Sequence, residues 1–235
     1  MILSGHQPGY LPYIGFFNKV MHSDIFVLCD YLQYVKKEWQ NRNRIREINA
    51  NWAWLTVPVY HTSKMKINEI MIDNRKNWGE KHLRILHQNY EKAPFFKDYE
   101  SFFEELYSRQ WKTLCELNET IIRYLFKELK IETQIIKGST LNPEGKKTDM
   151  LISMCKKTKA DTYLSGIGGH EYIDEPKFKE NRIFLFYQDY HCPQYSQCAE
   201  PFIPNMSVID LIFNMGSEKS RKLIFDSGGM IQADR

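Results

Sequence analysis

The stretch Ser4–Lys19, SGHQPGYLPYIGFFNK, joins a predicted strand to a predicted helix, and this start indicates the fold class. Met1–Leu3 is apolar enough to begin a buried strand, and apolar residues recur at helical spacing from Ile14 to Met21. Residues 25–29, IFVLC, form an unbroken apolar run, which fits a parallel strand covered on both faces. Strand, loop, helix and strand make a βαβ unit, so we predict an α/β fold with a mostly parallel, Rossmann-like sheet and flanking helices.

Polar and aromatic side chains fill the loop between the first strand and the first helix. His6, Gln7 and Tyr10 lie there among two prolines, each of which fixes φ and removes a backbone donor. Open α/β sheets bind ligands at the carboxyl ends of their strands, so this loop is a candidate site. Asp30 directly follows the second strand and is expected at the same edge. A second interpretation stays open, in which the loop is a proline-stiffened connection and His6 is a local hydrogen-bond donor.

The opening motif, His-Gln-Pro-x-Tyr-Leu-Pro-x-x-Gly-Phe-Phe-x-Lys, resembles the start of the WbqC-like family of bacterial proteins. The resemblance continues through Trp39–Ile45, Tyr163–Gly166 and Ser207–Asn214, in the same order, and so covers nearly the whole chain. Tyr13 stands where the family usually has Trp, which leaves an aromatic residue in place. The family is associated with genes for O-antigen and other surface polysaccharides, notably where an amino sugar carries an amino-acid or acyl group.

The βαβ start also resembles, in pattern only, the nucleotidyltransferase or HUP-type fold of the adenylyl- and cytidylyltransferases and pantothenate synthetase. In those enzymes a histidine loop after the first strand binds a triphosphate. Their signature has a second histidine about three residues after the first, where this chain has Gly9 and Tyr10. A phosphate site here would therefore need other donors.

Length and composition limit the class of protein. With 235 residues the chain fits a single α/β domain spanning 1–235, with a helical subdomain inserted at about 73–130. A net charge of +3 gives no argument for DNA binding and leaves a modest RNA contact open. Five cysteines without a Cys-x-x-Cys pair, and His82 and His87 five residues apart, predict no metal site. No secretion signal or membrane-length apolar run appears, so a soluble, cytoplasmic protein is expected.

Two further segments carry candidate ligand contacts. Arg42 and Arg44 share one face if their segment is a strand, with Asn41 on the other face, and Arg suits phosphate groups. This segment would fit a sugar-nucleotide diphosphate or ATP, although a solvated basic loop is the alternative. A glycine turn after the predicted strand 161–166 can bring backbone close to phosphate or sugar if it takes positive φ, although many αβ turns use such glycines structurally. Its candidate residues are Gly166, Gly168, Gly169 and Tyr172.

The remaining elements follow from periodicity and capping signals. We predict strands at 52–59, 66–72, 133–136 and 183–187 and a turn at 138–139. Helices are predicted from an N-cap at Asp73–Asn74 to a stop near Pro94, from 99 to 129 with a break near 108–112, and at 148–157. A helix from Ser207 to the Gly216 stop is expected, with Ser207 as N-cap and Asp210 in a capping box. The tail after Lys219 is expected to be loosely held.

The two resemblances together imply a reaction. ATP would activate the carboxylate of an amino acid as an adenylate, and the amine of a nucleotide-linked amino sugar would attack it to form an amide. A variant uses an aminoacyl-tRNA as the activated donor. In this scheme His6 neutralises charge on the phosphates, Asp30 is the general base, and the sugar is bound by Tyr195, Gln197 and Asn205. The alternatives are a non-catalytic module that binds a nucleotide sugar, and a sugar nucleotidyltransferase.

Overall fold

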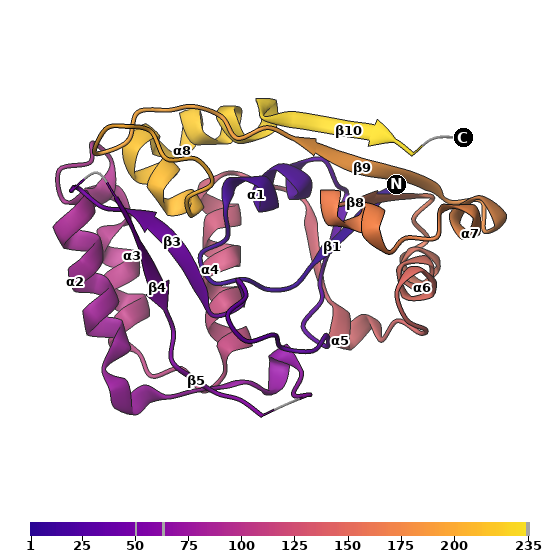
Figure 1. Cartoon of the computed structure of the whole chain (residues 1–235), viewed down its shortest axis with the longest axis horizontal. Coiled ribbons are helices and arrows are strands. Elements are labelled where there is room, and N and C mark those ends of the chain that lie inside the picture. The colour runs from indigo at the N-terminus through magenta and orange to yellow at the C-terminus, as the bar shows by residue number, and fades with distance from the viewer. Residues whose placement is uncertain (50, 63, 234–235) are drawn as a thin grey trace.

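A six-stranded, mostly parallel sheet forms the centre of the computed structural model, which describes residues 1–49, 51–62 and 64–233. The strands follow one another in the order β10-β9-β8-β1-β2-β7 (Figure 1). Their bounds are β1 (Ile2–His6), β2 (Ile25–Leu28), β7 (Gln134–Lys137), β8 (Thr162–Ser165), β9 (Phe184–Tyr190) and β10 (Gly228–Gln232). Only β10 runs antiparallel to its neighbour. The predicted Rossmann-like α/β class is confirmed.

The direction in which strands are added reverses beside β1. The chain builds outward from β1 through β2 to β7, and then returns to the other side of β1 to add β8 and β9. Such a reversal is a topological switch point, and open α/β sheets bind ligands in the crevice outside it. The candidate loop after β1 therefore lies at the edge where this fold forms its sites.

Both faces of the sheet are covered, as the apolar run 25–29 predicts. Phe26 and Leu28 join a cluster that contains α1 (Ile14–Met21) and α8 (Val208–Asp226). Ile25 and Val27 face the opposite way, into a second cluster with α6 (Thr148–Thr158) and α7 (Glu175–Glu180). Because neighbouring strand residues alternate between faces, a strand buried on both sides is apolar throughout.

The segment between β2 and β7 contains small β-structures followed by three helices. These elements are β3 (Arg42–Arg46), β4 (Trp52–Thr56), β5 (Val59–Tyr60), η1 (Ile67–Glu69), β6 (Met71–Ile72), η2 (Asn74–Lys76), α2 (Trp78–Tyr90), α3 (Phe96–Ser108) and α4 (Leu114–Glu128). The predicted break near 108–112 separates α3 from α4. The strand expected at 66–72 forms only at its end, because the Glu69 carboxylate accepts a hydrogen bond from the Lys66 backbone N–H (2.8 Å) and closes a 3₁₀ turn.

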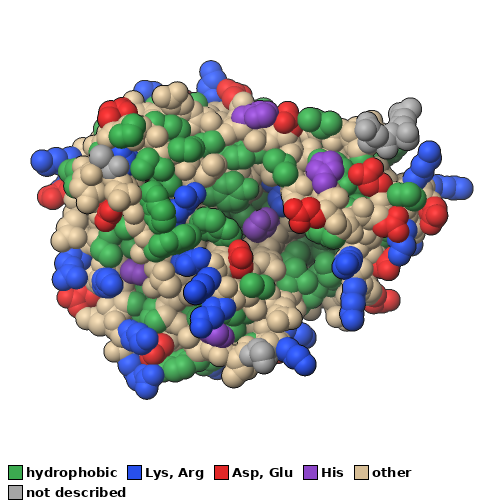
Figure 2. Space-filling view, in the orientation of Figure 1, with side chains coloured by type: hydrophobic (Ala, Val, Ile, Leu, Met, Phe, Trp, Pro, Cys, Tyr) green, Lys and Arg blue, Asp and Glu red, His purple; other side chains and the backbone are tan. Residues whose placement is uncertain are grey.

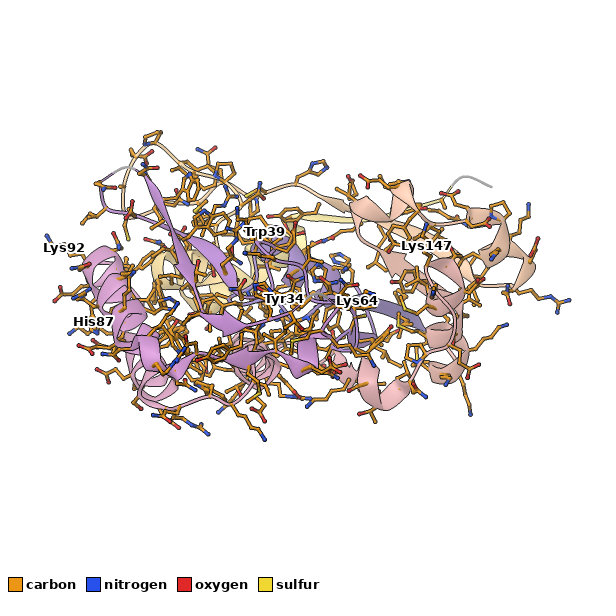
Figure 3. All side chains as sticks on the ribbon, turned by 60° about the horizontal axis from the view of Figure 1, so that its bottom comes forward. Tyr34, Trp39, Lys64, His87, Lys92 and Lys147 are labelled. Carbon is orange, nitrogen blue, oxygen red and sulfur yellow. The ribbon has the colours of Figure 1, made fainter. Side chains whose placement is uncertain are left out.

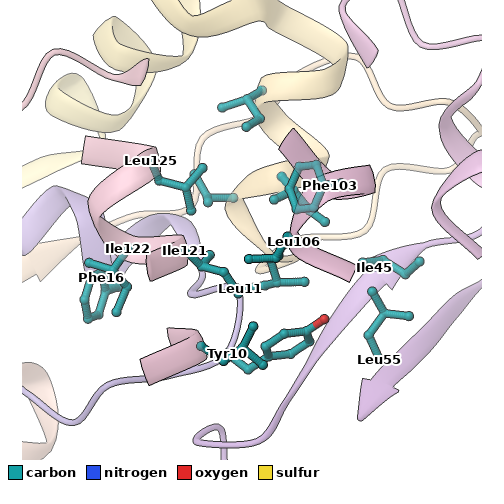
Figure 4. Close-up of a cluster of buried hydrophobic side chains, with 14 of the residues drawn as sticks. Tyr10, Leu11, Phe16, Ile45, Leu55, Phe103, Leu106, Ile121, Ile122 and Leu125 are labelled. Atoms are coloured by element: carbon teal, nitrogen blue, oxygen red, sulfur yellow. The ribbon is translucent and has the colours of Figure 1, made fainter. Parts of the chain in front are cut away.

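The three helices share one hydrophobic core with a face of the central sheet. Figure 4 shows side chains from the amino-terminal segment, the β3–β4 hairpin, α3 and α4 within this cluster: Tyr10, Leu11, Phe16, Ile45, Leu55, Phe103, Leu106, Ile121, Ile122 and Leu125. The division of the chain into an α/β domain and an inserted helical subdomain at 73–130 stays a prediction.

The carboxyl-terminal segment differs from the prediction. Ser207 does cap α8, accepting a hydrogen bond from the Ile209 N–H (3.4 Å), but the helix resumes after a break at Gly216 and runs to Asp226. The tail is also held, since β10 pairs with β9 and the Asn18 side chain donates to the carbonyl oxygens of Ile224 (2.9 Å) and Gly228 (3.1 Å). The prediction of a loosely held tail was therefore wrong. The sequence of the tail does not show that a polar side chain on α1, Asn18, binds its backbone.

Two short connections at the sheet edge also take helical form. The expected turn at 138–139 begins the short helix α5 (Gly138–Leu141), and the glycine turn after β8 forms the 3₁₀ helix η3 (Ile167–Glu171). Among the helices that the structure describes, none has both the length and the apolar character needed to cross a bilayer.

Candidate functional site

The carboxyl ends of β1 and β8 lie side by side at the switch point. Ser4 pairs with Leu164 in the parallel ladder, so His6 and Gly166, two residues further on, leave the sheet together. Figure 2 shows that the middle of this face is hollowed, with hydrophobic side chains on the walls and a histidine at the edge. The loops after β1 and β8 therefore meet at a crevice, as the switch-point rule predicts.

A buried lysine bridges these two loops. Lys19 is only 4% exposed, and its Nζ donates to the Gly5 carbonyl oxygen (2.9 Å). A Cβ at Gly166 would lie 3.6 Å from the same Nζ, so the ammonium group stands between the two strand ends. Within the described residues no carboxylate oxygen lies within 4.0 Å of it. An ammonium group has three donors and only one is used by the protein, which leaves this cation able to bind an anion.

Burial lowers the pKa of Lys19 to about 8, because the charged form loses its hydration. The group is still mostly charged at pH 7. Lys19 was not predicted as a site residue, although it is the last residue of the motif that carries the family resemblance. The sequence does not show that the side chain of Lys19, on α1, reaches back to Gly5 at the end of β1.

His6 stands beside this cation as a neutral base. Its Nδ1 lies 2.9 Å from the Gln7 carbonyl oxygen, which can only accept, so Nδ1 carries the proton and Nε2 keeps a lone pair. Burial, and then the charge of Lys19, lower the pKa of His6 to about 4. A neutral imidazole with a free Nε2 can accept a hydrogen bond or a proton from a ligand, and its low pKa makes it a weaker base than an ordinary histidine. The charge stabilisation that the sequence assigned to His6 fits the ammonium group of Lys19 better.

The segment before β3 packs against the histidine loop. The Gln40 amide donates to the Gln7 side-chain oxygen, and the Tyr10 N–H donates to the Trp39 carbonyl oxygen (3.2 Å). These contacts place the two predicted ligand segments next to each other. Gln7 is half-buried and faces this junction.

Arg42 and Arg44 stack on tryptophans along the β3–β4 hairpin. The guanidinium carbon of Arg42 lies 4.1 Å from the ring centroid of Trp54, and that of Arg44 lies 5.5 Å from Trp39 and 5.3 Å from Trp52. Arg44 also donates to the Asn205 carbonyl oxygen (3.2 Å), which brings the predicted residue Asn205 to the hairpin.

The three glycines in the turn after β8 differ in what surrounds them. Gly166 faces Lys19, whereas Gly168 has no atom within 4 Å of the place where a Cβ would stand, so its backbone is open to a ligand. A Cβ at Gly169 would come 2.0 Å from Ser165 Oγ, so this glycine permits η3 to pack on β8. None of the three takes a positive φ, contrary to expectation. Tyr172, at the end of η3, is 45% exposed.

Asp30 stays at the sheet edge but is fully engaged there. One of its oxygens accepts from the Ser139 N–H (2.7 Å) and the other from the Ser139 hydroxyl (2.6 Å), so the carboxylate caps α5. It is 3% exposed. Asp30 therefore has a structural role. His6, whose Nε2 has no partner among the described residues, is the better candidate for a base. Burial raises the pKa of neighbouring Cys29 to about 12, so its thiol stays protonated and is no nucleophile.

Two predicted ligand contacts, Tyr10 and Asn41, lie inside the protein. Tyr10 is fully buried, and its hydroxyl bonds Tyr107 (2.6 Å) and His82 (2.8 Å). Asn41 donates to the Val57 carbonyl oxygen (2.8 Å). These side chains satisfy interior partners and offer a ligand little or no surface.

Tyr195 and Gln197 both donate to the buried carboxylate of Asp210 (2.6 and 2.9 Å), which also accepts from Tyr90 (2.7 Å). The carboxylate of Asp210 therefore accepts hydrogen bonds from three side chains and does not form the expected capping box. The sequence shows polar residues in a loop but not which way they point, so a buried network and a ligand site give the same pattern.

Other features of the surface lie away from the crevice. Within the described residues, one group has ligand atoms close enough together for a metal ion: His87 on α2 with Glu100 and Glu104 on α3. Figure 3 places His87 far from Trp39, which adjoins the histidine loop. A hollow of about 640 Å³ lies between the end of α4 and the second half of α8. Neither feature touches the strand ends, so neither bears on the candidate site.

Comparisons with known proteins agree on one family. Residues 7–222 match the model of the WbqC-like protein family. A protein described as uncharacterized protein Rv1507c, from Mycobacterium tuberculosis (strain ATCC 25618 / H37Rv), is 32% identical over 216 residues, which is 90% of this chain and 93% of that protein. No solved structure matches the chain. The matched range includes Lys19, both hairpin arginines and the glycine turn, and it begins one residue after His6.

Proposed function

This chain belongs to the WbqC-like protein family, and from that premise we propose that it transfers an amino acid or a related acyl group onto the amine of a nucleotide-linked amino sugar. The family points to a glycan-associated role. The product is an amide, and the donor is a carboxylate activated either by ATP or as an aminoacyl-tRNA.

The observation that supports this proposal most directly is the pair of Lys19 and His6. An under-used, buried cation and a neutral base with a free lone pair lie together at the switch point. Acyl transfer to an amine needs both, since phosphate or oxyanion charge must be stabilised and the attacking amine must lose a proton. Gly166 adjoins Lys19, and two residues further on the Cβ position of Gly168 faces open space, so this turn leaves room for a ligand.

With ATP as activator, the amino-acid carboxylate attacks the α-phosphorus, which forms an adenylate and releases pyrophosphate. The sugar amine then attacks the adenylate carbonyl, the carbon–oxygen bond to AMP breaks, and the amine proton passes to His6 Nε2. Lys19 stabilises the phosphate charge in both steps. A positioned donor of this kind typically contributes about 3–4 kcal/mol to transition-state binding.

The test is a mass-spectrometric assay with dTDP-linked amino sugars and all proteinogenic amino acids, supplied either free with ATP or as total aminoacyl-tRNA. We expect the sugar nucleotide to gain the mass of an acyl group in at least one arm. His6→Ala should lower turnover by about 10²–10⁴-fold while keeping the fold, because a general base contributes that much. Lys92→Ala, at an exposed residue near the end of α2, is the control.

Three results would contradict the proposal. Tight binding of the sugar nucleotide without product in either arm would make the protein a binding module. Release of pyrophosphate from a nucleoside triphosphate and a sugar phosphate, with no amino acid required, would make it a nucleotidyltransferase. A His6→Ala variant with wild-type turnover would remove His6 from the chemistry.

A further inference from the structure

The β3–β4 hairpin carries stacked cations and aromatic rings next to the crevice. Within the described residues, neither Arg42 nor Arg44 has a carboxylate within 4.0 Å, and each donates one hydrogen bond to a backbone carbonyl, of Lys37 and Asn205 respectively. The Nε atoms of both are buried and have no partner. The rings therefore hold the guanidinium planes in place while their charges stay unneutralised. Trp39, at the edge of this group, is 45% exposed.

The surroundings of the hairpin are strongly basic. The segments 31–44 and 64–69 contain six basic residues, Lys36, Lys37, Arg42, Arg44, Lys64 and Lys66, and two acidic ones, Glu38 and Glu69. These two segments alone thus carry more net positive charge than the whole chain, whose net charge is +3. All four lysines are exposed. An excess of this kind, concentrated on one surface, attracts a polyanion.

Backbone contacts show that these segments form one surface. The Tyr34 N–H donates to the Met65 carbonyl oxygen (2.9 Å), and Gln33 forms a β-bridge with Lys66. Figure 3 shows Tyr34, Trp39 and Lys64 close together in the middle of the view. Through Trp39 and Gln40 the same surface is continuous with the histidine loop, because both residues contact it directly.

We propose that this Arg–Trp surface (Trp39, Arg42, Arg44, Trp52 and Trp54 with the four lysines) binds the unpaired 3′ end of a transfer RNA, so that the activated donor is an aminoacyl-tRNA. The inference rests on the proposed function and names its donor. Single-stranded nucleic acid is bound by aromatic rings that stack on bases and by a basic surface that follows the backbone. A single nucleotide needs one ring and a few donors, whereas this surface combines one exposed tryptophan, Trp39, with two half-buried ones and six cations.

The chemistry is then a direct exchange of an ester for an amide. A 3′ end stacked on Trp39 would bring its ester to the crevice, because Trp39 adjoins the loop of His6. The sugar amine attacks the ester carbonyl, and the bond from that carbon to the ribose oxygen breaks. His6 Nε2 takes the amine proton and passes it to the ribose oxygen, which leaves as a hydroxyl. No ATP is consumed by this protein.

The test is fluorescence anisotropy with a labelled acceptor-stem RNA hairpin that ends in an unpaired 3′ ACCA, compared with the same hairpin without these four nucleotides. We expect binding that requires the unpaired end. Trp39→Ala should weaken it about 5–150-fold and Trp39→Phe should restore most of it, since stacking on one ring contributes about 1–3 kcal/mol. Lys36→Ala/Lys37→Ala should reduce the dependence on salt, because phosphate contacts release counterions. Lys92→Ala/Lys97→Ala is the matched control, since both lysines are exposed, Lys92 in the turn after α2 and Lys97 on α3.

Equal binding of both hairpins, no binding of either at 100 mM salt, or an unaffected Trp39→Ala variant would overturn the inference. Amide formation from ATP and free amino acid without RNA would also overturn it, while leaving the proposed function intact. If the unpaired end binds as expected but charged tRNA yields no acylated sugar nucleotide, the RNA surface stands and the proposed function fails.

Discussion

At the scale of single residues, the site depends on a cation that the protein itself does not neutralise. Lys19 lies between Gly5 and Gly166, and its charge is one cause of the low pKa of His6. The two groups are therefore coupled: burial first, and then the charge of Lys19, hold the imidazole unprotonated, and the neutral imidazole leaves the ammonium charge uncompensated. This coupling can be measured as a change in the pKa of His6.

Lys19→Met should raise the pKa of His6 from about 4, although burial will keep it below 6.5. The substitution keeps an unbranched side chain and removes only the charge, so we expect a folded protein. NMR titration of the His6 ring signals measures the change, and Lys92→Met is the control. A His6 pKa that stays at about 4 in Lys19→Met would show that the two groups are not coupled.

Acidification should lower the stability of the protein between pH 6.5 and about 4. Burial lowers the pKa of His82 to about 4, so the unfolded chain binds a proton in this range and the folded one does not. His6 acts in the same direction. The loss from His82 is at most about 3 kcal/mol of unfolding free energy. Urea unfolding across this range should show a smaller loss in His82→Gln than in the exposed-site control His170→Gln.

Part of the candidate site could be predicted from residue types, and part could not. His6, Gln7 and Gly166 follow strands, and the rule that strand ends carry sites places them correctly at the sheet edge. Lys19 could not be found in this way because its role depends on a side chain reaching back to Gly5 across the loop. Tyr10 and Tyr195 look like ligand contacts in sequence, but their hydroxyl groups complete buried hydrogen bonds.

At the scale of elements, α8 shows how a local stop signal can be overridden by packing. Gly216 has φ 73° and ψ 167°, which interrupts the helix, yet Ile224 beyond it is fully buried and the helical turns continue. A glycine that ends a helix and one that only breaks it look alike in sequence. The difference comes from the second half of α8, which packs in the same core as α1.

Gly216→Ala should lower the free energy of unfolding by about 2–3 kcal/mol, because a side chain at positive φ is strained and its Cβ would come 2.9 Å from the Phe95 ring. Gly229→Ala in β10 is the matched control, since no atom lies within 4 Å of its Cβ position and its φ is not positive. Denaturation in urea measures both. Equal stability of the two variants would contradict the strain assigned to Gly216.

At the scale of the whole molecule, the helices between β2 and β7 pack into the same hydrophobic core as one face of the sheet. Phe16 and Phe17 of α1 contact Phe26 and Phe126, so α1, β2 and α4 share one aromatic cluster. The alternation of strands and helices predicted the sheet, most directly at the apolar runs 25–29 and 183–187. The shared core needed the structure, since contacts between distant segments leave no periodic signal.

This shared core predicts a single unfolding transition. Tryptophan fluorescence reports on the helical region through Trp78 and Trp111 once Trp39, Trp52 and Trp54 are replaced by Phe. In this variant, fluorescence and far-ultraviolet circular dichroism should give coincident midpoints in urea, as a two-state domain does. The same coincidence should hold for Val59→Ala, a partly buried residue outside the helices. Two separated transitions would show that the helices unfold as an independent unit.

The order of strands also has a consequence for synthesis on the ribosome. β1 emerges first and finds β2 at once, but its other edge is completed only by β8, which ends at Ser165. At translation rates of about 5–20 residues per second, the nascent chain carries an open central strand for roughly 7 to 30 s. During that interval the histidine loop has no partner across the crevice, so the candidate site is complete only after β8 has been synthesised.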